Sequence, residues 1–568
     1  MLLFRPLRRA SFRWLTVSAI LTVSSVAIAQ DKPEEKAAAA PSAGSSAGPS
    51  SAMTRASAPN DSTTDGSVTV GGQAIAYRAV AGTITVGGSD PQDATIGFDG
   101  RPLPDANVKL PERAEDAPPT ARMFYVAYFK KDAPAAQRPI VFAYNGGPGS
   151  PTMWLHMGTF GPKRIVTPDT QHQEGAPYTI VNNDHSLLDV ADIVFIDAPG
   201  TGLSRTFGKN KAEAFYGVDG DGHAFERFIR RFLSKYDRWN SPKYIFGESY
   251  GTPRSAVLAA DLRSVDLNGI ILLSQILSFD NSVDGPTANP GVDQAYALAL
   301  PTFAATAWYH HKLPTQPPAL KPFLEEVQKY ALGEYMTALL QGSDLSDSER
   351  QAVAEKLHGY TGLPVDYLIR ADLRVTGGEF SEELKLNEGM TTGRLDSRYE
   401  GPEVDPMSAT SSYDPQSDAI TSAWNTAINQ YMHDDLKYAT QETYLMSARQ
   451  GGEFSWNMNH QPPGRGFPGG GGGNNSSETG ANVMPDLAYR MKMNPKMKVM
   501  LAGGYYDLAT PYFEGVYEMH HLPMPKSLQS NISYHYYEAG HMIYVKEDVL
   551  KQFHADVAAF IKSTEGGK

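Results

Sequence analysis

A serine between two glycines, in the stretch Phe246–Gly251, has the residue types and spacing of a catalytic nucleophile. The run Lys243–Phe246 before it predicts a buried strand, and Arg254–Leu262 after it has apolar residues at helical spacing. A sharp strand-to-helix turn pushes the Ser249 hydroxyl out of the sheet, and glycines are needed there because side chains would collide. The same pattern also arises by chance in loops, so the rest of the chain has to decide between the two interpretations.

A serine nucleophile needs a base that takes its proton and a third group that orients the base. Histidine suits the base because its pKa lies near neutrality. Asp507 follows a predicted strand that ends at Ala502, and His541 follows the last predicted strand, Ile532–Tyr537. A lone Asp after a strand is usually a helix cap, and a lone His is usually structural. The order Ser249, Asp507, His541, however, is that of an α/β hydrolase. The competing histidines lie in a strand, a connection or the closing helix: His535, His520, His521 and His554.

The oxyanion of such a reaction needs two backbone donors. One is expected from the Tyr250 N–H, directly after the nucleophile, and the other from a loop after an earlier strand. The strand Pro139–Tyr144 ends in the glycine-rich turn Asn145–Gly147, whose N–H groups can face an anion. An ordinary turn between a strand and a helix is the alternative interpretation.

Strands and helices alternate around these turns. A third buried strand, Ile193–Ile196, leads into the turn Asp197–Ser204. The helix Ala224–Tyr236 follows, and Gly269–Leu273 is a further strand. The alternation predicts an α/β-hydrolase fold with a mostly parallel central sheet and helices on both faces. Sites in such sheets gather at the carboxyl ends of the strands, where all three glycine-rich turns lie.

Composition and pattern divide the chain into five parts. Residues 1–29 have a basic head, a short apolar run and an A-x-A end, which predicts a signal peptide cleaved after about Ala29. A membrane anchor is the alternative. Residues 30–66, rich in Ala, Ser and Pro, are expected to form a disordered linker. Residues 67–280 and 451–568 are expected to form the two parts of the hydrolase core, and residues 281–450 a helical insertion that acts as a lid.

Several local elements are expected within these parts. Short strands separated by turns begin at Ser67, in the runs Val68–Val70, Ile75–Arg78, Gly82–Val86 and Arg122–Phe129. The insertion has helical patches with no clear strand between them: Ala295–His311, Leu320–Gln341, Ser346–His358 and Thr421–Met432. A plain structural appendage is the alternative to a lid. The glycine run Gly469–Gly473 is expected to be disordered, because a phosphate-binding loop would need a strand before it and a Lys-Ser pair after it.

The charge and the lack of cysteine restrict the partners and the compartment. The 568 residues carry a net charge of −13, which becomes −17 without the four arginines of the first 29 residues. This charge argues against nucleic acid and anionic lipid as partners. Cysteine is absent, so an exported protein of this sequence uses no disulfides. We expect a secreted or periplasmic protein with no membrane insertion after signal cleavage, no cofactor and no metal.

Four motifs in order resemble those of the serine carboxypeptidases, the carboxypeptidase Y family. They are Asn145–Ser150, Asp197–Ser204, Gly247–Gly251 and Gly540–His541, and the resemblance covers residues 135–280 and 495–545. It implies an α/β hydrolase that removes residues from peptide C-termini. It also implies roles for individual residues. These are a triad of Ser249, Asp507 and His541, oxyanion N–H groups of Gly147 and Tyr250, and a substrate-carboxylate site at Asn145, Gly146 and Glu248.

Two positions depart from this family's pattern. Ser150 stands where the family usually has a cysteine, which removes a disulfide but no chemistry. Thr159 stands where a second glutamate commonly precedes a Gly-Pro pair, so a paired-glutamate arrangement with Glu248 is in question. The sequence thus indicates a serine carboxypeptidase that acts on peptides with a free C-terminus through an acyl-enzyme. An acyltransferase or esterase on the same scaffold is the first alternative, and a non-catalytic binding protein is the second.

Overall fold

The structure, a computed structural model, describes residues 60–108, 111–438, 441–452, 454–463 and 481–564. The expected signal peptide, residues 30–59 of the expected linker and the glycine run Gly469–Gly473 lie outside the described residues. None of the helices in these ranges is both long enough and apolar enough to span a membrane.

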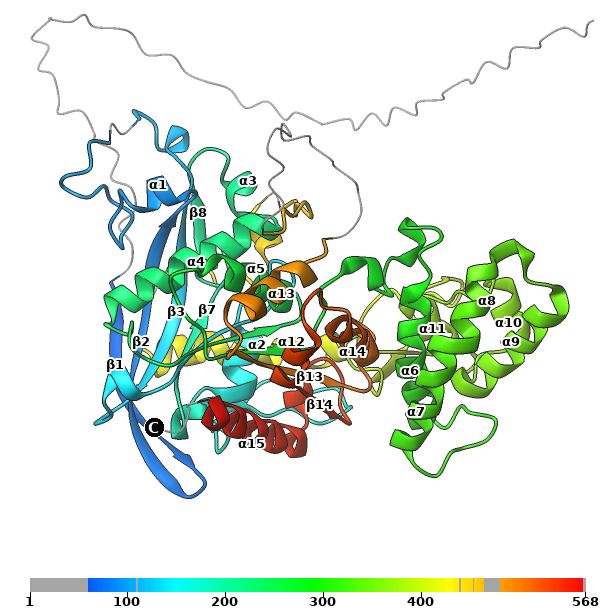
Figure 1. The fold of residues 1–568 in the computed structure, drawn as a ribbon. Coiled ribbons are helices and arrows are strands. Elements are labelled where there is room, and N and C mark those ends of the chain that lie inside the picture. Colours follow the sequence, from blue (N-terminus) through cyan, green and yellow to red (C-terminus); the bar gives the residue numbers. More distant parts are fainter. Residues whose placement is uncertain (1–59, 109–110, 439–440, 453, 464–480, 565–568) are drawn as a thin grey trace, which may run out of the picture. The chain divides into compact units, whose positions relative to one another are not determined.

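A large mixed sheet forms the centre of the described chain (Figure 1). Its strand order is β1-β2-β3-β7-β4-β9-β10-β13-β14, with β8 paired to β3. The first three strands are antiparallel: β1 Ser62–Val70, β2 Gln73–Gly87 and β3 Thr120–Lys130. The next six run parallel to one another: β7 Asp192–Ile196, β4 Ile140–Tyr144, β9 Lys243–Glu248, β10 Gly269–Leu273, β13 Lys498–Gly504 and β14 Ile532–Tyr537. Strand β8 is Arg205–Phe207.

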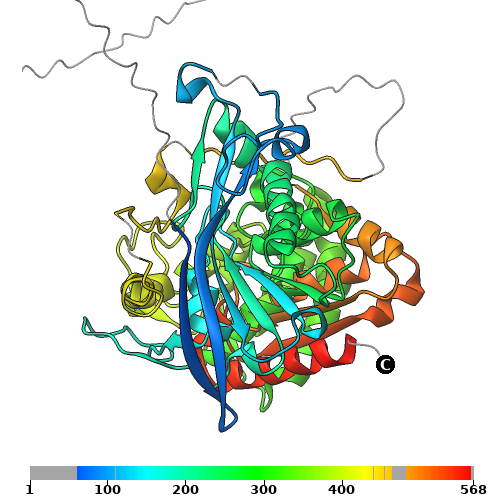
Figure 2. The same ribbon diagram turned by 90° about the vertical axis from the view of Figure 1, so that its left-hand side faces the viewer.

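Apart from the edge strand β14, the parallel strands are buried on both faces, as their continuous apolar runs require. In β4, Ile140, Phe142 and Tyr144 belong to one hydrophobic core, whereas Val141 and Ala143 belong to the other. The first core contains side chains of α4 Val218–Lys235, α5 Gly251–Asp261 and α13 Met484–Met493. The second contains side chains of α2 Met153–Leu155, α12 Pro415–Asp434 and α15 Glu547–Thr564. Figure 2 shows α12 (yellow) and α4 (green) on opposite sides of the strands. The expected α/β-hydrolase fold is confirmed.

The start of the sheet differs from the prediction. Strand β1 begins at Ser62 rather than at Ser67, and β2 is one continuous strand where two short ones were expected. Gly82 was expected to begin a separate strand, but it lies inside β2 opposite Tyr125. A Cβ atom on Gly82 would lie 2.2 Å from the carboxylate of Asp61, so this glycine marks a close approach of a neighbouring side chain and not a turn.

The insertion forms a group of helices, seen beyond β13 and β14 in Figure 1. They pack around a third hydrophobic core, which also contains Tyr506, Leu508, Tyr512 and Phe513 from outside the insertion. The helices of the insertion are α6 Gln294–Tyr309, α7 Leu320–Tyr330, α8 Met336–Gln341, α9 Asp347–Thr361, α10 Val365–Arg370 and α11 Gly377–Glu383. A wider π-helical turn, Ala331–Tyr335, separates α7 from α8, where one helix was expected. A two-stranded sheet was not expected: β11 Met390–Thr392 with β12 Glu400–Pro402. The remaining elements are α1 Asp90–Asp93, β5 Lys163–Ile165, β6 Ile180–Asn182, α3 Lys211–Phe215 and α14 Tyr512–His520.

The part of the insertion between β11 and β12 contacts the loops that follow β13 and β14. The carbonyl of Leu395 accepts a hydrogen bond from the His541 N–H at 2.6 Å, and the carbonyl of Arg394 accepts one from the Leu508 N–H at 3.1 Å. The buried carboxylate of Asp396 accepts a hydrogen bond from the Gly540 N–H at 3.1 Å. This 393–399 segment therefore joins the loop that carries Asp507 to the loop that carries His541.

The turn at Ser249 has the strained geometry expected of a nucleophile elbow. Ser249 has a φ of +58°, in the left-handed region. A Cβ atom on Gly247 would lie 2.1 Å from the carbonyl oxygen of Gly251. Glu248 and Tyr250 are buried, whereas Ser249 is partly exposed. The glycines are thus required by the close packing of the turn, which leaves the serine side chain accessible.

The strain at Ser249 predicts an unusual order of stability. Ser249→Gly should have a free energy of unfolding about 1 kcal/mol higher than Ser249→Ala, because glycine adopts a positive φ without the Cβ penalty. Urea denaturation of the two variants measures the difference. Ser255, inside helix α5, provides the control. Ser255→Gly should be less stable than Ser255→Ala by a similar amount, because glycine is unfavourable inside a helix. If the glycine variant were the more stable one at both positions, or the less stable one at both, the described turn would be contradicted.

The 393–399 segment predicts a second effect on stability. Asp396 forms a buried ion pair with Arg398, with 2.6 Å between Oδ2 and Nη2. Asp396→Asn should lower the free energy of unfolding by about 3 kcal/mol, because it leaves a buried guanidinium with less compensating charge. Asp105→Asn, at an exposed position, should change it by less than about 0.5 kcal/mol. Equal urea midpoints for the two variants would refute the role of Asp396.

Candidate active site

The expected acid and base lie side by side. Asp507 follows β13 and His541 follows β14, and Asp507 Oδ2 is 2.8 Å from His541 Nδ1. Both side chains are buried. Since the carboxylate can only accept, Nδ1 carries the proton and Nε2 keeps its lone pair. Burial alone would lower the pKa of His541, but the charge of Asp507 and its hydrogen bond outweigh burial and raise it.

Thr510 fixes the orientation of Asp507. Its hydroxyl donates to Asp507 Oδ2 at 2.8 Å, and its backbone N–H donates to Oδ1 at 3.0 Å. The Ala509 N–H donates to the same Oδ1 at 2.9 Å. Thr510 was not predicted from the sequence, although an aspartate followed three residues later by a threonine is a local signal for this turn.

Ser249 and His541 are both anchored at the end of β10. The Ser249 N–H donates to the Leu273 carbonyl at 2.9 Å, and the Ser274 hydroxyl donates to the His541 carbonyl at 2.7 Å. Among the described residues, the Ser249 hydroxyl has no hydrogen-bond partner, so the Asp507–His541 pair is formed while a Ser249–His541 hydrogen bond is not. Such bonds are often long in the absence of substrate and form in the reacting complex.

The turn after β4 lies against the start of helix α5. A Cβ atom on Gly146 would lie 2.3 Å from the Tyr250 nitrogen, so only glycine fits there. Gly147 has a φ of +108°. Within the described part of the chain, the backbone N–H groups of Gly147 and Tyr250 have no acceptor. The positive end of a helix and two unpaired N–H groups suit an anion.

Glu248, next to Ser249, is buried and hydrogen-bonded. Its Oε2 accepts from the Asn145 side-chain amide at 2.7 Å, and the Tyr544 hydroxyl lies 3.1 Å from Oε1 and 3.0 Å from Oε2. The Leu155 N–H donates to Asn145 Oδ1 at 2.9 Å, which fixes the amide with its nitrogen toward Glu248. Burial raises the pKa of Glu248 to about 7, against the opposing effects of His541 and the two donors.

Thr159 does not replace a second acidic group. Its hydroxyl donates to the Leu155 carbonyl at 2.6 Å, within its own helical turn. The ring of Tyr544 covers the preceding Gly158, where a Cβ atom would lie 2.7 Å from the ring. The described hydrogen-bond partners of Glu248 are therefore an amide and a phenol rather than a second carboxyl. Tyr544 was not predicted from the sequence, because its residue type and position carry no signal without the tertiary contact.

The motif Asp197–Ser204 has a structural role in this molecule. The buried Asp197 carboxylate accepts hydrogen bonds from the Thr152 N–H at 2.8 Å and the Leu203 N–H at 3.2 Å. The Ser204 hydroxyl donates to the Asp197 carbonyl at 2.8 Å. Burial raises the pKa of Asp197 to about 6 despite these donors. The motif thus attaches the turn after β7 to the one after β4.

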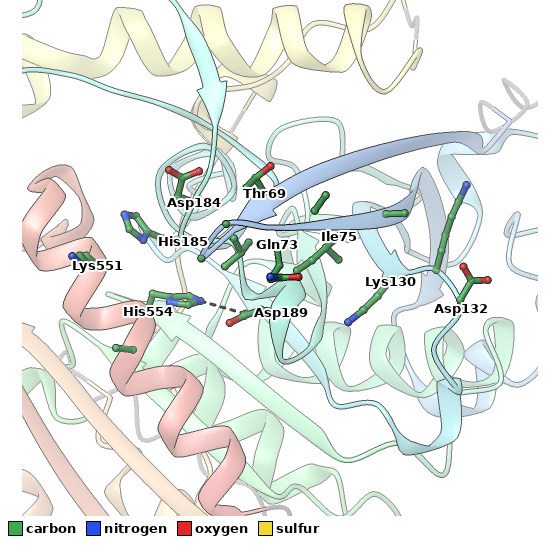
Figure 3. Close-up of a pocket in the computed structure, with 17 residues that line it drawn as sticks. Thr69, Gln73, Ile75, Lys130, Asp132, Asp184, His185, Asp189, Lys551 and His554 are labelled. Carbon is green, nitrogen blue, oxygen red and sulfur yellow. Dashed lines mark hydrogen bonds and ion pairs between the residues drawn. The ribbon is translucent and has the colours of Figure 1, made fainter.

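A groove of about 1040 Å³ lies elsewhere, between the β1–β2 hairpin and helix α15 (Figure 3). Its lining includes His554, whose Nε2 is 3.3 Å from Asp189 Oδ1, as well as His185 and Lys130. None of the candidate site residues lines it. His554 is therefore engaged at the surface, in agreement with its rejection as the base.

Comparison with known proteins supports the resemblance. A family model described as serine carboxypeptidase matches residues 114–264. "Serine carboxypeptidase-like 28" from Arabidopsis thaliana is 28% identical over 31% of this chain and 37% of its own length. "Pheromone-processing carboxypeptidase KEX1" from Phytophthora infestans is 31% identical over 23% of this chain and 21% of its own. The chain thus spans well under half the length of the curated relatives it matches.

A solved structure, proline iminopeptidase from Mycobacterium smegmatis, aligns with 78% of this chain and 96% of its own at 11% identity, with a TM-score of 0.33. The family model matches a shorter part of the chain, residues 114–264. This part includes the turns after β4, β7 and β9 but ends before Asp507 and His541. Residues 114–264 thus match the serine carboxypeptidase family.

Proposed function

We propose that the protein is a serine carboxypeptidase that releases C-terminal residues from peptides through an acyl-enzyme. The observation that carries the proposal is the Asp507–His541 hydrogen bond, located beside the elbow of Ser249 in a chain that matches this family. The acid and the base come from outside the family match, yet they meet in the order and at the strand ends that the reaction requires.

In this mechanism, Ser249 Oγ attacks the carbonyl carbon of the last peptide bond while His541 Nε2 takes its proton. The carbonyl oxygen becomes an oxyanion, which accepts hydrogen bonds from the N–H groups of Gly147 and Tyr250. The C–N bond breaks, and His541 returns the proton to the leaving amino group. A water molecule then attacks the ester in the same way and regenerates Ser249. Asp507 holds His541 and stabilises its charged form.

The selectivity for the last residue rests on Asn145, Gly146 and Glu248. These residues adjoin Ser249, and Glu248 stays neutral up to about pH 7 because it is buried. A neutral carboxyl donates a hydrogen bond to the C-terminal carboxylate of the peptide, whereas an ionised one repels it. Substrate binding places a second negative charge beside Glu248 and raises its pKa further.

Export and the lid role of residues 281–450 complete the proposal. The basic head, the apolar run and the A-x-A end of residues 1–29 support removal of a signal peptide. The 393–399 segment supports a function of the insertion at the active site, because it contacts the loops of Asp507 and His541.

The proposed triad predicts losses that do not add. Ser249→Ala should lower kcat by about a millionfold, and His541→Ala and the double variant should be about as inactive, because the groups act as one unit. A fluorophosphonate probe should label the parent and not Ser249→Ala. Ser563→Ala, on helix α15, is the control and should keep full activity and labelling. Retention of more than a few per cent of the activity in purified Ser249→Ala would refute the assignment.

The proposed carboxylate site predicts a dependence of KM on pH. KM for a free-acid peptide should be low below about pH 7 and should rise as pH passes the pKa of Glu248, because the ionised form repels the substrate. The rate falls on the acid side as His541 is protonated, so the profile is bell-shaped. A matched ester without a free carboxylate should lack the rise, and Glu248→Gln should abolish it. A flat KM for the free acid from about pH 5 to about pH 9 would contradict this role of Glu248.

A further inference from the structure

Tyr544 lies three residues after His541 and reaches the carboxyl group of Glu248. Its side chain is 3% exposed, and its hydroxyl is nearly equidistant from the two oxygens of Glu248, at 3.1 and 3.0 Å. A hydroxyl has one proton to donate, so this proton is shared between two acceptors. By rotation of the O–H bond, this proton can be donated to another acceptor while the hydroxyl oxygen stays in place.

We propose that the Tyr544 hydroxyl binds the C-terminal carboxylate of the peptide together with Glu248, and so acts as a specificity-determining residue. This inference rests on the proposed function. When Glu248 gains a proton, it becomes a donor itself and no longer needs two donors. Asn145 still donates to Oε2, and the Tyr544 hydroxyl is then released toward the incoming carboxylate.

The packing of the ring fixes where that hydroxyl points. Gly158 lies directly beneath the ring, and any Cβ atom there would lie 2.7 Å from it. The Tyr544 ring therefore has little freedom to move, and the hydroxyl remains beside Glu248. Residue 158 is thus a second requirement of the arrangement, since a larger side chain would displace the phenol.

Tyr544 differs from an acidic partner in how it responds to pH. Burial and the neighbouring charge of Glu248 raise the pKa of Tyr544 well above its usual value, so it stays a donor at all working pH. The charged groups that face Glu248 are His541, which lowers its pKa, and Asp507, which raises it. The site then combines a permanent donor, Tyr544, with one group that titrates near neutrality, Glu248.

The direct test measures binding, in the inactive Ser249→Ala background. The dissociation constants of a blocked dipeptide with a free C-terminus and of its amide are compared by calorimetry, with and without Tyr544→Phe. Tyr544→Phe should weaken the free acid about tenfold and leave the amide unchanged, because one hydrogen bond to a charged group is lost. Tyr537→Phe, which removes another buried hydroxyl, is the matched control and should change neither constant.

The pH dependence gives a readout that a merely structural role would not move. Tyr544→Phe removes a donor that favours the charged form of Glu248, so the pKa of Glu248 should rise and the loss of affinity should shift to higher pH. In a Glu248→Gln background, Tyr544→Phe should cause no such pH shift but should still weaken binding of the free acid about tenfold. Equal weakening of acid and amide, or unchanged affinity for the acid, would overturn the proposal. If selective binding persisted but the parent cleaved no peptide, the proposed function would fail and the role of Tyr544 would stand.

Discussion

The turn after β4 meets the turn after β9 with no space for a Cβ atom between them. The close contact of Gly146 with the Tyr250 nitrogen is one example. The buried side chain of Arg254, on α5, joins this helix to the turn after β4 and to α4: it donates to the Asn145 carbonyl at 2.6 Å and to the Asp221 carboxylate at 2.6 Å. The position of α5 relative to the turn after β4 is therefore fixed, and the position of Ser249 depends on it.

The parts of the site that were predictable have local signals. Ser249 lies between glycines at the end of a strand, and Asp507 and His541 each follow a strand in the expected order. The period of the strands and the glycine pattern were therefore enough to predict these three residues. Thr510 and Tyr544 were not found. Thr510 acts through a short turn whose significance depends on knowing that Asp507 is an acid, and Tyr544 acts through a contact with Glu248 from a distant part of the chain.

The fold could be predicted to the level of its class and layers, because buried parallel strands and amphipathic helices have distinct periods. The predicted boundaries of elements were wrong where a residue type has two possible structural roles. Gly82 was taken for the start of a separate strand, although it lies inside β2, where it makes room for the side chain of Asp61. The short pair β11 and β12 has too few residues for a period to be recognised. Helix α12 was assigned to the insertion by its position in the chain, but it packs on the central sheet.

The carbonyl groups of Arg394 and Leu395 make part of the insertion inseparable from the hydrolase core. A shortened protein that joined residue 280 directly to residue 451 would keep Ser249, Asp507 and His541. Three buried N–H groups in the loops that carry Asp507 and His541, those of Leu508, Gly540 and His541, would nevertheless lose their acceptors, at about 1–3 kcal/mol each. Exchange of this region between relatives, in evolution or in the laboratory, thus has to retain the 393–399 segment and helix α12 as scaffold.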